Sequence, residues 1–181
     1  VAALSATYLS DDDRSAESFY RVNRAKNLAE TRAALTFLKA PVLNLVFADR
    51  AGDIGFMAAG KIPVRRQGQG YYPQAGWDGQ HDWQGFMPFA EQPQSANPKK
   101  GFVVTANNPV VSPKAGRFIS RDWAAPYRAR RIDEELRRVE THSAATAAKL
   151  QLDVVSTMAR ELVPVMLGLV KSTDPNMTQA L

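Results

Sequence analysis

The sequence predicts an α+β fold in which antiparallel strands are flanked by helices. Apolar residues recur at helical spacing in residues 13–39 and again in residues 132–170. From Pro41 the period changes to that of strands, and Asp49-Arg50-Ala51-Gly52-Asp53 has the composition of a tight turn. Two strands joined by a turn this short must run antiparallel. These observations together define the predicted fold class.

The first helical stretch, residues 13–39, is expected to form two helices. Asp13 or Ser15 can cap the first helix, because a short polar side chain there can accept from the exposed N–H groups of the first turn. Asn27-Leu28-Ala29-Glu30 has the capping-box pattern for the second helix.

In the second helical stretch, Ile132 marks the apolar face of one helix, and Ser143 can cap another that runs to about Lys149. Residues 150–170 keep a helical period, with a break or kink expected near Pro164. Residues 172–181 carry no core pattern and are expected to be a cut end or linker.

The strand predictions begin with a hairpin of residues 42–48 and 54–57, both of whose faces are expected to be largely covered. Residues 65–100 are rich in Gly, Pro, Gln and aromatic residues, and are expected to form an ordered loop packed by its own aromatic side chains. Phe102-Val103-Val104 is a candidate for a short buried strand that ends just before Asn107.

Composition excludes several classes of site. The 181 residues include no Cys, which rules out disulfides, a Cys-ligated zinc site and a thiol nucleophile within this sequence. The net charge is +5, but basic residues are interspersed with acidic ones, as in residues 130–138, which favours a solvated helix face over a nucleic-acid-binding patch. The longest apolar run, residues 162–170, is shorter than the roughly 18 residues of a membrane span. We therefore expect no nucleic-acid partner and no membrane span.

The titratable residues suggest no familiar self-contained site. The chain has only two His, and no Gly-x-Ser-x-Gly elbow accompanies the neighbouring His81 and Asp82, so a Ser-His-Asp triad is disfavoured. Two isolated His without Cys also make a zinc site a poor interpretation. Asp11-Asp12-Asp13 lacks the glycine and the terminal glutamate of an EF-hand loop, and a solvated helix-capping run explains it better.

Asn107 and Arg128 are the candidate site residues. The run Thr105-Ala106-Asn107-Asn108-Pro109 follows an apolar stretch, and a carboxamide N–H held there could stabilise an oxyanion during acyl transfer. Arg128 could add positive charge to the same site. The residues alone favour other interpretations, because Asn-Asn-Pro is good turn chemistry and an arginine at a helix start is commonly a surface or ion-paired residue.

Taken together, the segments resemble the penicillin acylase (penicillin amidase) family of N-terminal nucleophile hydrolases, which also contains acyl-homoserine lactone acylases. The matching runs cover nearly the whole chain in family order. They are "DDRSAESFYRVNRAKN", "NLVFADRAGDIGFMAAGKIPVRR", "GWDGQHDWQGFMPF", "NPKKGFVVTANNPV", "RDWAAPYRARRIDEEL" and "LQLDVV".

The resemblance implies a four-layered αββα architecture and hydrolysis of linear amides by the N-terminal Ser of a chain released by autoproteolysis. That Ser would attack the amide carbonyl with its own α-amino group as general base, which requires no His. By the same resemblance Asn107 matches the oxyanion asparagine, with Asn108 as the weaker choice, and Arg128 matches the active-site arginine.

The resemblance also implies that the nucleophile lies upstream of this sequence, so that residues 1–171 are an inner fragment of the large catalytic chain. We expect this fragment to be inactive alone and to self-associate. The expected partners are a small-molecule N-acyl amide, such as a penicillin or an acyl-homoserine lactone, and the remaining segments of the same precursor, namely the small chain and the rest of the large chain. No cofactor is expected, and family members often bind a structural calcium whose ligands the sequence does not specify. The implied location is periplasmic or secreted, in a bacterium. The alternative is a non-catalytic binding or structural module on the same scaffold.

Overall fold

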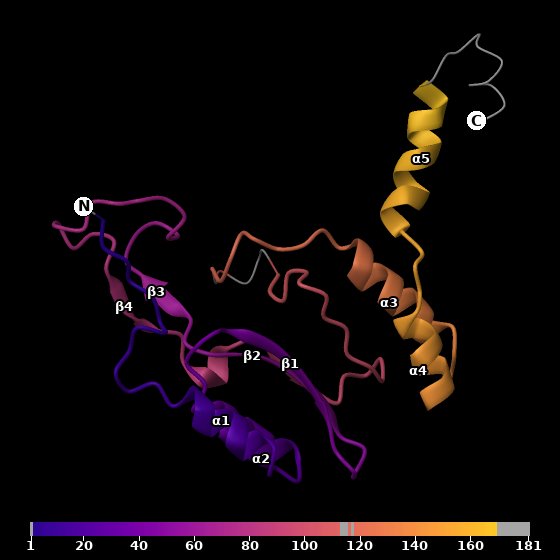
Figure 1. Ribbon diagram of the computed structural model, residues 1–181, viewed down its shortest axis with the longest axis horizontal. Helices are drawn as coiled ribbons and strands as arrows, with labels where there is room; N and C mark the ends of the chain where they lie inside the picture. Colours follow the sequence, from indigo (N-terminus) through magenta and orange to yellow (C-terminus); the bar gives the residue numbers. More distant parts are fainter. Residues whose placement is uncertain (1, 113–115, 117, 170–181) are drawn as a thin grey trace. The chain divides into compact units, whose positions relative to one another are not determined.

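The computed structural model describes residues 2–112, 116 and 118–169. These residues form two compact units, one within Val1–Thr105 and Pro109–Trp123 and the other within Ala106–Asn108 and Ala124–Leu181. The first unit contains two α-helices and the described strands, all of them paired antiparallel, and the regular elements described in the second unit are all α-helices (Figure 1). The predicted α+β class with antiparallel strands is confirmed.

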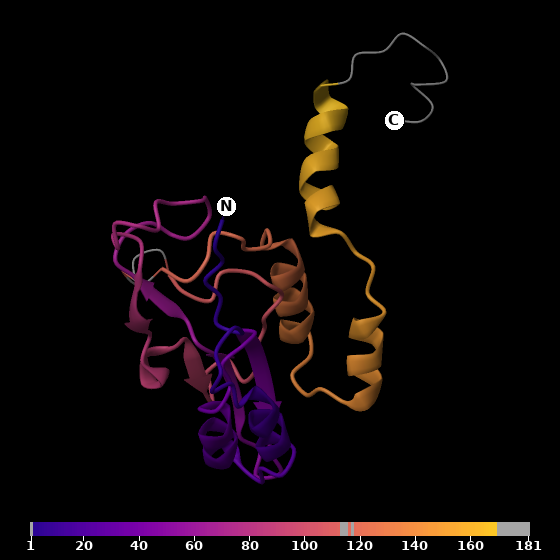
Figure 2. The same cartoon turned by 60° about the vertical axis from the view of Figure 1, so that its left-hand side comes forward.

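In the first unit, α1 (Ser15–Val22) and α2 (Leu28–Leu35) lie side by side (Figures 1 and 2). Asn27 caps α2 as predicted, but the return bond of the predicted capping box goes to the residue before the cap. Asn27 Oδ1 accepts from the backbone N–H of Glu30 at 2.9 Å, and the Glu30 carboxylate accepts in return from the N–H of Lys26 at 2.9 Å. The start of α2 is therefore determined by local sequence, as expected.

The two residues predicted to cap α1 have different roles at the start of this helix. Asp13 Oδ1 accepts from the backbone N–H of Ser15 at 3.0 Å, so Asp13 supplies the acceptor while Ser15 is the first residue of the helix. The Ser15 hydroxyl accepts from the N–H of Lys39 at 2.9 Å, and so connects α1 to the loop after α2. Further along, the fully buried Ser18 donates to the carbonyl of Ala34 at 2.9 Å and joins the two helices.

The main sheet has the order β1 (Leu43–Ala48), β2 (Ile54–Ala59), β5 (Gln94–Ala96), with antiparallel pairing throughout. The predicted hairpin is β1–β2. Its turn is stabilised by Asp49, whose Oδ1 accepts from the backbone N–H groups of Ala51 and Asp53 at 2.9 and 3.0 Å. Such an Asx-type arrangement favours the turn locally.

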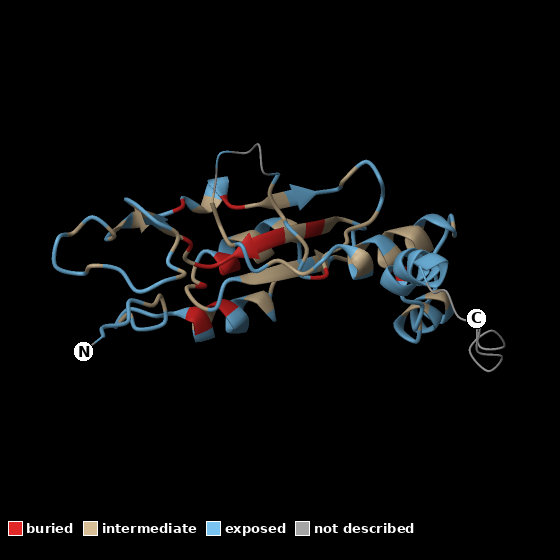
Figure 3. Ribbon diagram, turned by 90° about the horizontal axis from the view of Figure 1, so that it is seen from above, coloured by how far each residue is buried: buried red, intermediate tan, exposed pale blue. Residues whose placement is uncertain are grey.

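The core of the first unit lies between α2 and β2, where Figure 3 shows the buried residues concentrated. The fully buried members are Leu35, Leu38, Met57 and Ala59. Coverage is less complete than predicted for the hairpin as a whole, because β2 is mostly buried whereas β1 alternates between half-buried and exposed residues. The exposed face of β1 includes Val46, which is 53% exposed.

The expectation that residues 65–100 form one loop packed by its own aromatic residues is wrong in two respects. The segment contains β4 (Trp83–Phe86), which pairs with β3 (Pro63–Arg65), and it also contains β5. Trp83 and Phe86 do pack edge to face, but Trp77 is 89% exposed. These strands escape prediction because they are three or four residues long, too short to show a period, and because their partners are distant in sequence.

The predicted strand at Phe102-Val103-Val104 is also absent, since the structure assigns these residues to no strand. Apolar residues alone do not make a strand, because a neighbour must complete the hydrogen-bond ladder. Just after this segment, Asn44 Nδ2 of β1 donates to Thr105 Oγ1 at 3.1 Å.

The second unit contains α3 (Tyr127–Arg137), α4 (Ala144–Gln151) and α5 (Thr157–Leu169). Ser143 caps α4 as predicted, in a reciprocal capping box with Thr146.

The third helix of this unit, α5, departs from its prediction. It begins only at Thr157, after a non-helical segment, and continues through Pro164. Within the described residues, no helix is long and apolar enough to cross a membrane. Residues 172–181, expected to be a cut end or linker, lie outside the described part of the chain.

Candidate functional site

The candidate site is built on a short backbone segment, Ala106–Asn108, that belongs to the second unit. Asn107 has φ 62°, in the left-handed region, where Asn is tolerated better than most residues. Its carbonyl accepts from the backbone N–H of Ala124 at 2.8 Å. The side chain of the neighbouring Asn108 folds back onto the turn, where its Oδ1 accepts from the N–H of Ala106 at 3.0 Å. The backbone of this turn is thus held at several points.

Arg128, in the first turn of α3, reaches this segment with its guanidinium. Its Nη2 donates to the carbonyl of Ala106 and to Oδ1 of Asn107, both at 2.9 Å. The two residues singled out by the sequence are therefore in direct contact, although they lie 21 positions apart in the chain.

The contact determines how the Asn107 amide is oriented. A guanidinium carries donors only, so the amide atom facing it must be the oxygen. The Nδ2 group then points away from Arg128, and within the described residues no partner accepts its hydrogens. Because Asn107 is exposed, this N–H donor is available to a ligand oxygen, and it lies beside a fixed positive charge. Such a donor suits the stabilisation of a developing oxyanion.

Behind Arg128, the first turn of α3 contacts the segment between α4 and α5. Arg131 binds Asp153 in a bidentate ion pair, with Nε to Oδ1 at 3.0 Å and Nη2 to Oδ2 at 2.6 Å. Both side chains are largely buried, and Arg131 also pairs with Glu135 at 2.6 Å. The guanidinium lowers the pKa of the Asp153 carboxyl, and the carboxylate in turn raises the pKa of Arg131. Both groups remain charged at neutral pH.

Neither Asp153 nor Arg131 is predicted as a site residue from the sequence, although both lie in runs that carry the family resemblance. A signal is present, because Asp153 is a single acid in the apolar run Leu152-Asp153-Val154-Val155. An acid so placed is expected to need a cationic partner. The sequence does not indicate which of the chain's many arginines that partner is.

A hollow of about 440 Å³ lies beside these residues in the second unit. Its walls combine the two arginines and Asp153 with apolar residues of α3 and of residues 150–157. The lining residues include Tyr127, Arg128, Ile132, Leu150, Val155 and Thr157. Arg128 thus contacts both the Asn107 turn and a concave, partly apolar surface.

The other polar clusters of the sequence form no comparable site. In the described part of the chain no group of three or more His, Asp or Glu could hold a metal ion. His142 contacts the carbonyl of Leu136 at 3.0 Å, as a residue of the helix connection. Asp12 forms an ion pair with Lys39, and hydrogen bonds from Lys39 and Ser10 lower its pKa to about 2, consistent with the solvated, structural interpretation of this acidic run.

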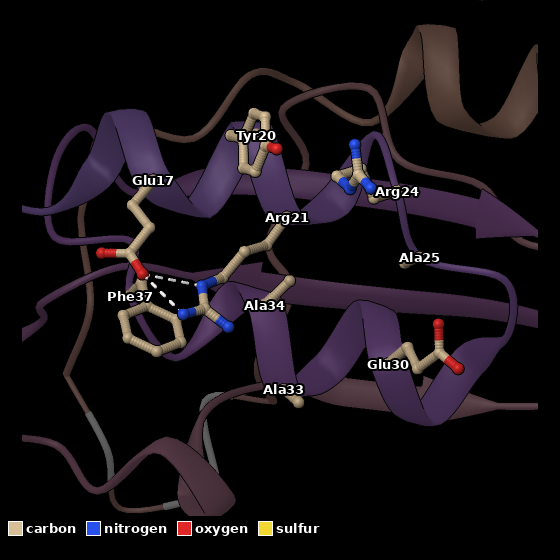
Figure 4. Close-up of a pocket in the computed structure, with 9 residues that line it drawn as sticks. All are labelled: Glu17, Tyr20, Arg21, Arg24, Ala25, Glu30, Ala33, Ala34 and Phe37. Atoms are coloured by element: carbon tan, nitrogen blue, oxygen red, sulfur yellow. Dashed lines mark hydrogen bonds and ion pairs between the residues drawn. The ribbon is translucent and has the colours of Figure 1, made fainter.

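The first unit has a larger hollow, about 570 Å³, between α1 and α2 (Figure 4). Two of its charged side chains, Arg21 and Glu17, pair with each other. Arg21 donates to Glu17 at 2.8 Å, and the Arg21 guanidinium lies 4.4 Å from the centre of the Phe37 ring. We assign no function to this hollow.

Comparison with known proteins places the chain in a family. The family model described as penicillin amidase matches residues 1–181. An acyl-homoserine lactone acylase, QuiP, of Pseudomonas fluorescens (strain Pf0-1) is 36% identical over 151 residues, which are 83% of this chain and 18% of that protein. A penicillin acylase 2 proenzyme of Pseudomonas sp. (strain SE83) is 37% identical over 113 residues, covering 62% of this chain and 15% of the proenzyme.

The fold also has a match among solved structures. The structure of a thermostable penicillin G acylase from Alcaligenes faecalis matches with a TM-score of 0.72 at 20% identity, over 93% of this chain and 31% of that one. The described part of this chain therefore shares the fold of a part of that structure. The chain spans about a fifth of the length of the curated relatives it matches. On the strength of these matches, the chain belongs to the penicillin amidase family.

Proposed function

We propose that this chain is part of an amidohydrolase that cleaves linear N-acyl amides through an acyl-enzyme, and that Asn107 supplies one oxyanion donor. The observation that carries the proposal is the bond from Arg128 Nη2 to Asn107 Oδ1 at 2.9 Å, which leaves Asn107 Nδ2 unoccupied among the described residues. An amide donor in a fixed orientation can contribute about 3–4 kcal/mol to transition-state stabilisation.

In this proposal the roles of the two residues differ. Asn107 Nδ2 would donate to the oxygen of the tetrahedral intermediate. Arg128 would hold the amide by its oxygen and add a positive charge near the developing negative charge. The carbonyl of Ala106, the second acceptor of Arg128, keeps the guanidinium in place. Asn108 is a poorer candidate, because it is half-buried where Asn107 is exposed, and its side chain folds back onto the N–H of Ala106 rather than being held by Arg128.

The nucleophile is proposed to be the N-terminal Ser of the mature large chain, outside these 181 residues, with its α-amino group as general base. Acylase relatives that are several times longer than this chain support a parent protein of this kind. We further propose autoproteolytic release of that Ser, no activity for the 181 residues alone, and a periplasmic or secreted location in a bacterium. Penicillins and acyl-homoserine lactones, named in the relatives' descriptions, are the substrate classes to test first.

The first test is N-terminal sequencing and intact mass of the mature protein from its natural source. A large chain that begins with Ser, Thr or Cys and contains this sequence supports the proposal. A mature chain without such a residue at its N-terminus would instead favour the non-catalytic module.

The second test measures turnover of N-acyl substrates by variants of the parent protein. Asn107→Ala should lower kcat by about 10²–10³. Asn107→Asp separates the two functions of the amide, because it keeps an acceptor for Arg128 but removes the donor, and it should lose at least as much activity. Asn97→Ala is the matched control, since Asn97 also has a positive φ, 45°, but belongs to the first unit. Full turnover in both Asn107 variants would contradict the oxyanion role.

A further inference from the structure

The first turn of α3 is held by the segment 153–157 on both sides of Arg128. One contact is the bidentate pair of Asp153 with Arg131, three residues after Arg128. The other is a hydrogen bond from Thr157 Oγ1 to the carbonyl of Tyr127, the residue before Arg128, at 2.9 Å. We call Arg131, Asp153 and Thr157 the α3 clamp. It fixes the backbone from which the Arg128 side chain extends.

The clamp differs from the other polar links of α3 in its burial. The side chains of Arg131 and Asp153 are 11% and 19% exposed, and Thr157 is 4% exposed. In contrast, Arg130 and Glu161, which join α3 to α5 at 2.8 Å, are 47% and 49% exposed. Exposed pairs contribute little because water screens them, whereas a shielded bidentate pair holds both distance and orientation.

The carboxylate of Asp153 is itself fixed. Its Oδ1 accepts from the backbone N–H of Val155 at 3.1 Å in addition to Arg131 Nε. Asp153 therefore holds the guanidinium of Arg131 from a rigid position. Since Arg128 and Arg131 are three residues apart, they lie on neighbouring parts of one helix surface.

We propose that Asp153 and Thr157 are positioning residues for the proposed amidase reaction, which act through α3 on Arg128 and so on the orientation of Asn107. Arg128 Nη2 donates to two acceptors at once, both at 2.9 Å, and this double contact requires α3 to lie at a fixed distance from the Ala106–Asn108 segment. A displacement of a catalytic group by about 1 Å can reduce the catalytic rate by about 100-fold. This inference rests on the proposed function, since it assumes that Asn107 acts in turnover.

The first experiment measures kcat and KM of the parent protein with Asp153→Asn, which keeps the size of the side chain but removes its charge. The clamp predicts a fall in kcat of about 10- to 100-fold with KM changed less than about threefold. Glu161→Gln is the matched control, because it neutralises the acid of the exposed ion pair between Arg130 of α3 and Glu161 of α5. The kcat of this variant should stay at the wild-type value. Equal kcat for Asp153→Asn and wild type would overturn the inference.

A second pair of variants covers the case in which Asp153→Asn fails to fold. Thr157→Val removes the hydroxyl at nearly constant volume, and Thr157→Ser keeps it. The clamp predicts reduced kcat for the Val variant and recovery in the Ser variant, with KM little changed in both. Two variants that lose kcat equally would point to packing rather than to the hydrogen bond, and would contradict the inference.

A double-variant cycle separates positioning from a general structural effect. In the Asn107→Gly background the amide is absent, so Asp153→Asn should lower kcat by less than about threefold, well below its effect in the wild type. Equal effects in both backgrounds would show that Asp153 acts independently of Asn107 and would overturn the clamp. The two proposals can fail separately. If the single variant Asn107→Gly keeps its kcat, the oxyanion role is refuted. If Asn107→Gly loses kcat but Asp153→Asn does not, only the clamp is refuted.

Discussion

At the scale of single residues, Asn107 combines two roles that the sequence presents as alternatives. Its φ of 62° is that of a turn residue, and its amide is held by Arg128 as a site residue would be. The left-handed backbone sends the side chain toward Arg128 while its own carbonyl is held by the N–H of Ala124. The turn interpretation and the oxyanion proposal are therefore compatible in one residue.

The backbone of Asn107 gives a prediction about stability that is separate from turnover. Asn107→Ala keeps a Cβ in the left-handed region but removes the polar side chain that makes this conformation tolerable for Asn, whereas Asn107→Gly adopts the same φ without the steric cost of about 1 kcal/mol. We expect the Gly variant of the parent protein to unfold at a higher temperature than the Ala variant, although both lose the amide. Thermal unfolding followed by circular dichroism tests this, and a lower midpoint for Gly than for Ala would contradict it.

The sequence singles out Asn107 and Arg128 but does not predict that they are in contact. Asn107 stands out as an amide after an apolar run, and Arg128 stands out through the family resemblance. Their hydrogen bond joins residues 21 positions apart, and it depends on the turn at Ala106–Asn108 and on the helix start at Tyr127 together. No local sequence pattern shows that two residues so far apart in the chain are in contact. The clamp escapes prediction for the same reason, since Arg131 and Asp153 are 22 residues apart.

At the scale of elements, the features predicted correctly are those that local sequence determines. The helix caps at Asn27 and Ser143 and the turn at Asp49 each involve residues within four positions of one another. The wrong or incomplete predictions involve β4, β5 and the apolar run at Phe102, where pairing partners decide the outcome. A strand is defined by its neighbour, which a single stretch of sequence does not reveal.

The cap of α2 gives the first prediction at this scale. Asn27→Ala leaves the N–H of Glu30 without its side-chain acceptor and should destabilise the protein by about 1 kcal/mol. Asn27→Ser, which can still accept this hydrogen bond, should recover most of the loss. Chemical denaturation of the parent protein measures both. A Ser variant as unstable as the Ala variant would show that the cap is not the cause.

The ion pair between Asp153 and Arg131 gives a prediction about pH. Because Arg131 holds the pKa of Asp153 below its ordinary value of 3.8, the pair's contribution to stability is fully present above that value and is lost as the pH falls through the lowered pKa. The thermal midpoint of Asp153→Asn should thus lie below that of wild type by a constant amount from about pH 5, roughly one unit above the ordinary pKa, to about pH 8. The difference between the two thermal midpoints should decrease only below pH 3.8.

A direct measurement compares the two midpoints across this range in one buffer series. The difference between the proteins isolates Asp153 from the other carboxyl groups that titrate in acid, since those are common to both. A gap that closes between about pH 8 and about pH 5 would mean that another group, and not the Asp153 carboxylate, determines the effect.

At the scale of the whole chain, much apolar surface is left uncovered in both units. In the first unit Val46 of β1 is 53% exposed, and in the second unit α5 exposes apolar residues along most of its length. The exposed apolar residues of α5 are Met158, Leu162, Val163, Val165, Met166, Leu167 and Leu169. Soluble monomers rarely expose contiguous apolar surface of this extent. Hydrophobic burial therefore favours association of this surface with other protein.

We accordingly expect the 181 residues, expressed alone, to self-associate as concentration rises. The driving force is the burial of exposed apolar side chains, worth about 25 cal/mol per Å² removed from water. Light scattering over a wide concentration range measures the association. Replacing Val165 and Met166, which are 60% and 61% exposed, with Lys should weaken it without disturbing the core, because neither side chain is buried. A monomer at every concentration would contradict the prediction. Association that the two Lys substitutions leave unchanged would instead assign it to another surface, such as the open face of β1.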